Sequence, residues 1–277
     1  MSVALPWYLR RANAVIGLVL LSLAALLTLW GEIAPPYNPV DLMFEDRLEP
    51  PSAAHWFGTD QFGRDVFSRV LAAAGVSLFV SLLTVGFAIV FGTAIGAVAG
   101  YCSGWTDRIV MTVMDALMAL PSLLLALAIL SALGPGKYGV VLALGLAYTP
   151  SVARVVRANA LSIREKEYVE ASRVMGNSGL FTILRHVIPN CISSLIVLAT
   201  AFLALAILTE SALSFLGLGV PPPYPSLGGM LSDSRSYFSI APWLAVFPGI
   251  AISLMLLGFN LFGDALRDRF DPRLAGT

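Results

Sequence analysis

Charged residues are scarce in this chain of 277 residues. Asp, Glu, Lys and Arg make up 12% of it, whereas a soluble domain contains about 25%. Hydrophobic residues reach 57%, against roughly 45 to 50% in a soluble domain. This lack of charge excludes an ordinary soluble domain and indicates an integral membrane protein.

Cysteine and histidine are almost absent, with two residues of each. Cys102 and Cys191 both fall near the predicted cytoplasmic ends of apolar segments, where thiols stay reduced, so we expect two inert cysteines and no disulfide. His55 and His186 both lie outside the apolar segments. An intramembrane enzyme needs a nucleophile and base, or clustered metal ligands, at matching depth, and is therefore disfavoured.

Long apolar runs are what the sequence does contain. A spanning helix needs about 20 mostly apolar residues. Six windows qualify: 13–29, 75–101, 109–133, 138–158, 190–213 and 243–264. We therefore predict an all-α integral membrane protein with six transmembrane helices. The first window lacks a small-residue cleavage site and is too long for a signal-peptide core, which favours a retained span.

Glycines and prolines within these windows predict how the spans pack and bend. Gly92, Gly96 and Gly100 recur every four residues and form a face that another helix can approach closely. Kinks are expected where prolines interrupt the third, fourth and sixth windows, at Pro121, Pro150 and Pro248. The predicted spans therefore form a closely packed bundle with bent members.

The basic residues predict the orientation. If the N-terminus is cytoplasmic, twelve of the 17 Lys and Arg residues lie in cytoplasmic segments, as the positive-inside rule requires. We expect both termini to face the cytoplasm. The predicted parts are an N-terminal span and extracytoplasmic loop (1–74), a five-span core with a cytoplasmic loop over 159–189 (75–266), and a cytoplasmic tail (267–277).

A short amphipathic helix is predicted in the cytoplasmic loop. Tyr168, Ala171 and Met175 recur at spacings of three and four, which puts them on one stripe of a helix, with Ser172 beside them. Gly176 follows where a left-handed C-terminal cap requires a residue without a β-carbon. Helix geometry alone leaves two interpretations open, a helix that lies on the membrane and binds nothing, or a helix that docks on a partner.

The residue spacing of this loop resembles the "EAA" motif of permease subunits in binding-protein-dependent ABC importers. Glu170, Ala171 and Ser172 are followed by Gly176, six positions after the glutamate, and by Pro189, thirteen after the glycine. Ser172 stands where the motif has its last alanine. Four further segments are similar to the branch that imports dipeptides, oligopeptides and nickel: 55–69, 114–127, 214–223 and 259–274. Within it, the chain is most similar to the second permease of dipeptide and oligopeptide systems.

The resemblance implies one subunit of a larger assembly in the bacterial cytoplasmic (inner) membrane. The chain would pair with a homologous permease as a heterodimer and form half of the translocation path. Two ATPase subunits or domains, an extracytoplasmic substrate-binding protein and the lipid bilayer would be its other partners, and no nucleic acid is expected. The loop helix would be the coupling helix, which docks on an ATPase. Its expected contact residues are Tyr168, Glu170, Ala171, Ser172, Met175 and Gly176.

No stretch of the sequence matches the phosphate-binding pattern G-x-x-x-x-G-K-[ST]. The nearest stretch, GPGKYG from Gly134, has Tyr138 after the lysine, where the pattern requires Ser or Thr. We therefore expect no enzyme activity and no cofactor in this chain. In the assembly that the resemblance implies, ATP and Mg would be used by the partner ATPase subunits.

Two acidic residues inside the predicted spans are candidates for the translocation path, because intramembrane ionisable groups tend to be functional. Glu210 lies near the outer end of the fifth window and is the better candidate. Asp115 lies in the third window, where a salt bridge on the cytoplasmic side is an equally good explanation.

The outer segments carry the expected contacts with a substrate-binding protein. Thr59 or Asp60 is expected to cap a helix that runs toward Leu71. By resemblance, this segment and the loop over 217–242 form the surface that receives the binding protein. The candidate contact residues are Thr59, Asp60, Arg64, Asp65, Pro222 and Tyr224.

Three alternative functions remain open from the sequence. A nickel or metal-chelate importer of the same family is the first, since Met111, Met114 and Met118 share one helix face, although such a stripe also suits simple packing. An ion-coupled secondary transporter would show an internal repeat and charges at mid-membrane, and neither is clear. The intramembrane enzyme is the third.

Overall fold

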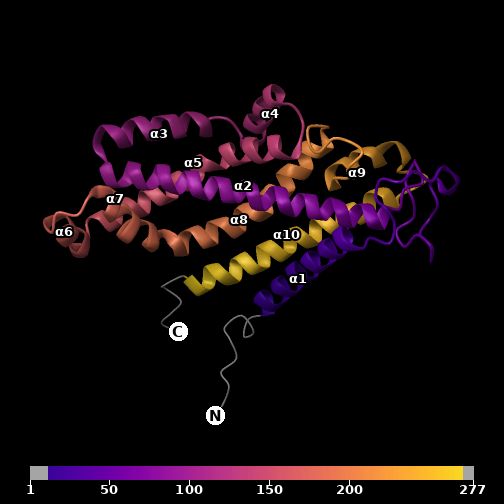
Figure 1. Ribbon diagram of the computed structural model, residues 1–277, viewed down its shortest axis with the longest axis horizontal. Helices are drawn as coiled ribbons and strands as arrows, with labels where there is room; N and C mark the ends of the chain where they lie inside the picture. Colours follow the sequence, from indigo (N-terminus) through magenta and orange to yellow (C-terminus); the bar gives the residue numbers. More distant parts are fainter. Residues whose placement is uncertain (1–11, 271–277) are drawn as a thin grey trace, which may run out of the picture.

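The computed structural model describes residues 12–270, and this part of the chain is a bundle of helices (Figure 1). Its α-helices are α1 (Ala12–Ile33), α2 (Val66–Cys102), α3 (Gly104–Met118), α4 (Ser122–Leu133), α5 (Lys137–Arg164), α6 (Glu167–Val174), α7 (Gly179–Thr182), α8 (Ile188–Phe215), α9 (Leu227–Ser234) and α10 (Trp243–Phe270). Short helical turns cover Phe44–Asp46, Ile183–Val187 and Arg235–Tyr237. The described part therefore has the all-α architecture that the sequence predicts.

Five helices within residues 12–270 are long and apolar enough to cross a membrane. They are Ala12–Ile33, Val66–Cys102, Lys137–Arg164, Gly179–Phe215 and Trp243–Arg269, and they include five of the six predicted windows. The chain is thus a multi-pass membrane protein. α2 begins nine residues before its window because it continues beyond the apolar run into the layer of loops beside α9.

The third predicted window, 109–133, is interrupted at Pro121, where the sequence predicts a kink, and the break is sharp. α3 and α4 meet at an angle of 89°, so this window folds as two helices, which together are long and apolar enough for a sixth crossing of the membrane. Pro121 has an extended ψ of 136° and stands immediately before α4. A proline also disfavours helical geometry in the residue before it, here Leu120, which explains why the break falls at this point.

The predicted glycine face lies between α2 and α5, which run side by side. A β-carbon added at Gly96 would lie 2.3 Å from the carbonyl oxygen of Ala153, and one added at Gly92 would lie 2.9 Å from that of Thr149. Only glycine allows the two backbones to approach this closely, so the prediction of a close-approach face is confirmed.

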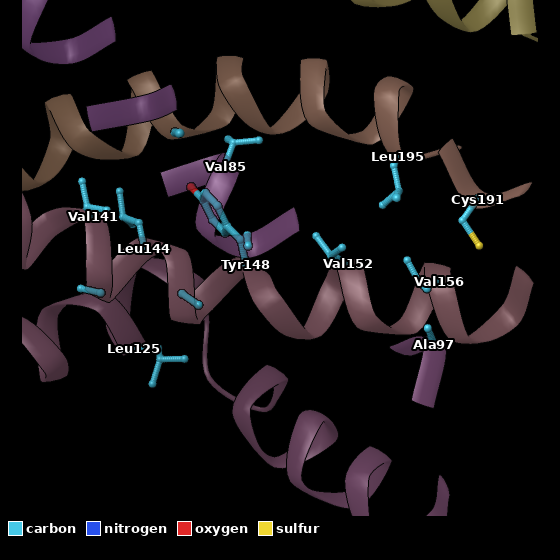
Figure 2. Packing of buried hydrophobic residues seen from close by; sticks show 14 of the residues in the cluster. Val85, Ala97, Leu125, Val141, Leu144, Tyr148, Val152, Val156, Cys191 and Leu195 are labelled. Carbon is cyan, nitrogen blue, oxygen red and sulfur yellow. The ribbon is translucent and has the colours of Figure 1, made fainter. Parts of the chain in front are cut away.

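The larger apolar core lies where α5 meets α2 and α8. Figure 2 shows Tyr148, Val152 and Val156 of α5 between these helices, and the ring of Tyr148 stacks on Phe202 at 5.1 Å. A second core joins the ends of α2, α8 and α10 to α9. Many large apolar side chains on the outside of the bundle are exposed, as expected for helices that face lipid. The two ends of this bundle, here called the α6 end and the α9 end, carry the candidate sites.

Candidate functional site

The first candidate site is the loop at the α6 end, and α6 has one buried side and one exposed side. Val169 and Ser172 are buried and lie three residues apart, so they share the side that faces the bundle. The Ser172 hydroxyl accepts a hydrogen bond from the Asn177 amide at 3.1 Å and lies 3.4 Å from the Thr182 hydroxyl. The sequence predicts Ser172 as a contact residue beside the stripe of Tyr168, Ala171 and Met175, but its side chain is buried and faces the bundle.

The exposed side of α6 carries apolar side chains. Val174 and Met175 are 83% and 73% exposed, and Ala171 and Tyr168 are exposed beside them. Glu170 is also exposed. The other helical contact candidates, Tyr168, Glu170, Ala171 and Met175, are therefore all accessible. Sequence reasoning missed Val174, although its spacing of three from Ala171 was the signal that could have found it.

Gly176 ends α6 in the predicted way. Its φ is +81°, a left-handed value that a residue with a β-carbon adopts only at a cost. The amide of Asn177 donates to the carbonyl of Ser172 at 3.2 Å, and the amide of Gly176 donates to that of Arg173 at 2.9 Å. These two bonds form a Schellman motif, so the predicted C-terminal glycine cap is confirmed.

A cation–π contact connects α6 to the end of α2. The guanidinium carbon of Arg173 lies 4.9 Å from the centre of the Tyr101 ring, and its Nε donates to the Tyr101 hydroxyl at 3.3 Å. Arg164, the last residue of α5, also donates to the backbone carbonyl of Tyr101. The short helix is therefore in contact with the end of one long span and directly follows another.

Glu210 is buried between α2 and α8. Glu210 is only 1% exposed. One carboxylate oxygen accepts a hydrogen bond from the hydroxyl of Ser77 in α2 and the other from that of Ser214 in α8, both at 2.7 Å. Each oxygen thus has a partner, as a buried carboxylate requires. The carboxylate holds the two helices together within this chain and does not line an open surface of it.

Asp115 forms an ion pair, which its sequence position allowed as the alternative to a contact with the path. Its Oδ1 accepts from Nη2 of Arg154 at 2.6 Å, and both side chains are more than half exposed. The carboxylate of Asp107 accepts hydrogen bonds from both Nε and Nη2 of Arg157. Two ion pairs therefore connect α3 to α5. Among the described residues, the stripe of Met111, Met114 and Met118 has no cluster of other metal ligands beside it. Residues 12–270 contain no group of three or more His, Cys, Asp or Glu that could hold a metal ion.

The second candidate site is the layer of loops at the α9 end, which begins with a helix cap. Asp65, and not Thr59 or Asp60, caps the helix: its Oδ2 accepts from the Ser68 amide at 2.7 Å, and α2 starts at Val66. The predicted cap is therefore wrong by at least five residues. The reason is that residues 59–65 form a turn of their own, which an isolated bridge between Thr59 and Asp65 closes.

Acidic side chains hold this turn together from within. Asp60 accepts from the Phe62 and Arg64 amides at 2.8 and 3.0 Å and from Nε of Arg64 at 2.7 Å. Asp65 also pairs with Nδ1 of His55 at 2.9 Å. All four predicted contact residues of this segment, Thr59, Asp60, Arg64 and Asp65, are buried. They can shape a docking surface but lie beneath it, whereas Pro222 and Tyr224 are exposed.

A pocket of about 460 Å³ opens beside this turn. It is lined by residues of the turn, by residues of the loop before α9 and of α9 itself, and by single residues from other elements: Gln61, Phe62, Arg64, Arg69, Pro135, Ser214, Gly217, residues 219–226, Gly229, Met230 and Ser232. Asp233 of α9 also lines it. Partial burial raises the pKa of the Asp233 carboxyl above its usual value, and the charges of Arg69 and Arg64 act against that rise.

Comparison with known proteins gives consistent matches. The family model for "binding-protein-dependent transport system inner membrane component" matches residues 92–276. The chain is 41% identical to the glutathione transport system permease protein GsiD of Pectobacterium atrosepticum, over 99% of this chain and 93% of that protein. It is 40% identical to the dipeptide transport system permease protein DppC of Alkalihalophilus pseudofirmus, over 96% and 87%. A putative peptide transport system permease protein of Brucella suis is 47% identical over 96% and 90%.

Among solved structures, the fold is similar to a chain of the MetNI methionine ABC transporter in an inward-facing form. The TM-score is 0.57 at 17% identity, over 71% of this chain and 93% of that one. A chain of an amino acid ABC transporter matches with a TM-score of 0.52 at 18% identity, over 70% and 90%. These two likenesses concern the fold alone.

Proposed function

The chain belongs to the family of binding-protein-dependent transport system inner membrane components, and we propose that it is the permease subunit of an ATP-driven importer of dipeptides or oligopeptides. It is a transporter subunit and not an enzyme. The observation that carries the substrate class is the identity of 40 to 47%, over nearly the whole chain, to permeases named for glutathione, dipeptide or peptide transport.

The α6 end is the proposed contact with the ATPase. Val174 and Met175 would enter an apolar cleft on that partner, with Tyr168, Glu170 and Ala171 around them. A charged helix with so much exposed apolar surface is otherwise unexplained at the end of a membrane bundle. Because α6 follows α5 directly and Arg173 contacts Tyr101 of α2, a displacement of α6 would be transmitted to both spans.

The remaining partners follow from the family and from the geometry. A homologous permease would complete the path as a heterodimer, two ATPase subunits or domains would hydrolyse ATP with Mg, and an extracytoplasmic binding protein would deliver peptide to the α9 end. Glu210 would act as a positioning residue near the outer end of the path, since it joins α2 and α8 there. Asp115, in an exposed ion pair, is the weaker path candidate.

Uptake assays test this function. The permease would be produced with its neighbouring transporter subunits in bacteria that lack other peptide and nickel importers, and uptake of labelled di- and tripeptides and of nickel would be measured. ATP-dependent peptide uptake is expected, and it should disappear when the permease gene alone is deleted. Nickel uptake without peptide uptake would contradict the peptide assignment and support the metal branch of the same family.

Cysteine labelling tests the proposed location, an inner membrane with both termini in the cytoplasm. Ser52 and Ser178 are both exposed. Ser52 belongs to the loop between α1 and α2 and Ser178 directly precedes α7, and these two segments lie at opposite ends of the bundle (Figure 1). With an impermeant thiol reagent on intact spheroplasts, Ser52→Cys should react at once and Ser178→Cys only after the membrane is opened. The reverse pattern would overturn the orientation and, with it, the assignment of α6 to the ATPase.

A further inference from the structure

The pocket at the α9 end has the size and the walls of a site for a small molecule. Its volume of about 460 Å³ falls in the range of about 300 to 1,000 Å³ that ligand pockets occupy. One wall is the proline-rich run 221–225, whose backbone is stiff. Another wall includes Gln61, Phe62 and Arg64 of the turn, which the Asp60 hydrogen bonds hold in place. Both walls are therefore already in position before any ligand arrives.

Arg64 provides a cation within this pocket. The residue is only 8% exposed, its Nε is bonded to Asp60, and its guanidinium carbon lies 4.6 Å from the centre of the Phe62 ring. Among residues 12–270, neither Nη group of Arg64 donates a hydrogen bond to the protein. Neither Nη atom is among the buried side-chain atoms without a partner in residues 12–270, so both are open to solvent in the pocket and can bind an anion.

Asp233 provides an acidic group on the pocket wall formed by α9, and it is exposed. Arg69 also lines the pocket, but its Nη1 donates to the carbonyl of Pro39 and its Nε lies 3.5 Å from Asp60. The pocket thus contains Arg64 as the cation with unbonded Nη groups and Asp233 as an exposed acid, which interacts with Gln61 and with the two arginines. A short peptide carries the complementary pair, an α-carboxylate and an α-ammonium group. An arginine fork can bind a carboxylate through two parallel N–H···O bonds, which also orients it.

We propose that this pocket is a receiving site for short peptides, in which the Nη groups of Arg64 bind the C-terminal carboxylate and Asp233 faces the N-terminal ammonium. The inference rests on the proposed function, because it assumes peptide as cargo. A small peptide can reach a residue that is 8% exposed, whereas a protein surface laid across the pocket would meet Pro222 and the 66% exposed Tyr224 first. The site holds the peptide after the binding protein releases it and before it enters the path.

Protection of a cysteine in the pocket tests this inference. Ser232 lines the pocket and is partly exposed, so Ser232→Cys in the complete transporter should react with an impermeant maleimide. Without binding protein, a millimolar tripeptide should slow this reaction severalfold, and the same tripeptide with an amidated C-terminus should not. Ser52→Cys, exposed and outside the pocket, is the matched control and should react equally fast in all cases.

The variant Arg64→Gln identifies the cation. Combined with Ser232→Cys, it should abolish protection by the free peptide, and Arg64→Lys should restore part of it. If loss of the Asp60 contact keeps Arg64→Gln out of the membrane, the comparison of free with amidated peptide decides the question by itself. Equal protection by both peptides would overturn the assignment of the carboxylate to Arg64.

Three further outcomes separate this inference from the proposed function. If peptide uptake is intact but free peptide never protects Ser232→Cys, the receiving site is wrong and the importer assignment stands. If only the binding protein protects it, the pocket is a protein-docking surface, which also overturns the proposal. Absence of peptide uptake in the unaltered transporter would instead remove the premise.

Discussion

The two ends of the bundle are built in opposite ways. At the α9 end, the turn over 59–65 buries its polar side chains and pairs them with one another, as in the contacts of Asp60 with Arg64 and of Asp65 with His55. At the α6 end, Val174 and Met175 extend into open space, and few side-chain contacts join α6 to the bundle. The turn of the first region is held together by contacts within this chain, whereas the exposed side of α6 is left uncovered by the described residues.

This difference shows how stability and function are separated in the molecule. A buried polar network is stable only when every member has its partner, so changes at the α9 end should weaken the fold. Exposed apolar residues contribute little to the fold and much to an interface that covers them. Changes at the exposed side of α6 should therefore affect assembly and leave the subunit folded.

The largest effect is expected from Asp65→Ala at the α9 end. The change removes the N-terminal cap of α2, worth about 1 kcal/mol, and leaves buried His55 without its partner, which costs about 1 to 3 kcal/mol. The free energy of unfolding should fall by about 2 to 4 kcal/mol, seen as a lower thermal midpoint in detergent and less protein in the membrane. Glu45→Ala, an exposed acid of the same loop, should behave like the unaltered protein.

The converse effect is expected from Val174→Asp on α6. A charge placed in an apolar cleft loses its water, so co-purification with the ATPase and peptide uptake should both fall by about tenfold or more, a loss typical of a central interface residue. The thermal midpoint of the isolated subunit should stay unchanged, because the side chain is 83% exposed. Glu165→Gln, exposed just before α6, is the control. Normal uptake by Val174→Asp would remove α6 from the ATPase interface.

A smaller effect is expected from Glu210→Gln, a change at the carboxylate that is buried between α2 and α8. The amide offers one acceptor oxygen in place of two, so either Ser77 or Ser214 loses its acceptor. Peptide uptake should fall severalfold, while the affinity of the binding protein for peptide stays the same. Ser77→Ala removes one donor and should act in the same direction. If Glu210→Gln lowers uptake and Ser77→Ala does not, the carboxylate acts on the cargo and not through the helices.

The smallest effect is expected from Arg173→Ala, which sharpens the account of α6. The contact with the Tyr101 ring is worth about 0.5 to 1 kcal/mol at an exposed site. Uptake should decline less than in Val174→Asp, and Tyr101→Ala should give a similar decline. Arg185→Ala, which removes the same charge from another exposed position, is the control. A non-additive double variant, measured as a cycle, would confirm that the two side chains act as a pair.

Several features could be predicted from the sequence because they depend on neighbours along the chain. Five of the six windows lie in long helices, since the length of an apolar run is a local property. The left-handed Gly176 and the close approach at Gly96 were also correct, because in both cases only a missing β-carbon satisfies the geometry.

The tertiary structure alone decided the features that depend on distant residues. Ser172 faces inward because Thr182 and Asn177 surround it, and a helical stripe by itself does not say which side a bundle covers. Asp65 caps α2 because the preceding turn closes on itself, which made Thr59 and Asp60 interior residues. Glu210 is enclosed because Ser77, 133 positions away, lies against it. Periodicity and spacing describe the chain within a few turns, whereas burial is decided by which segments meet in space.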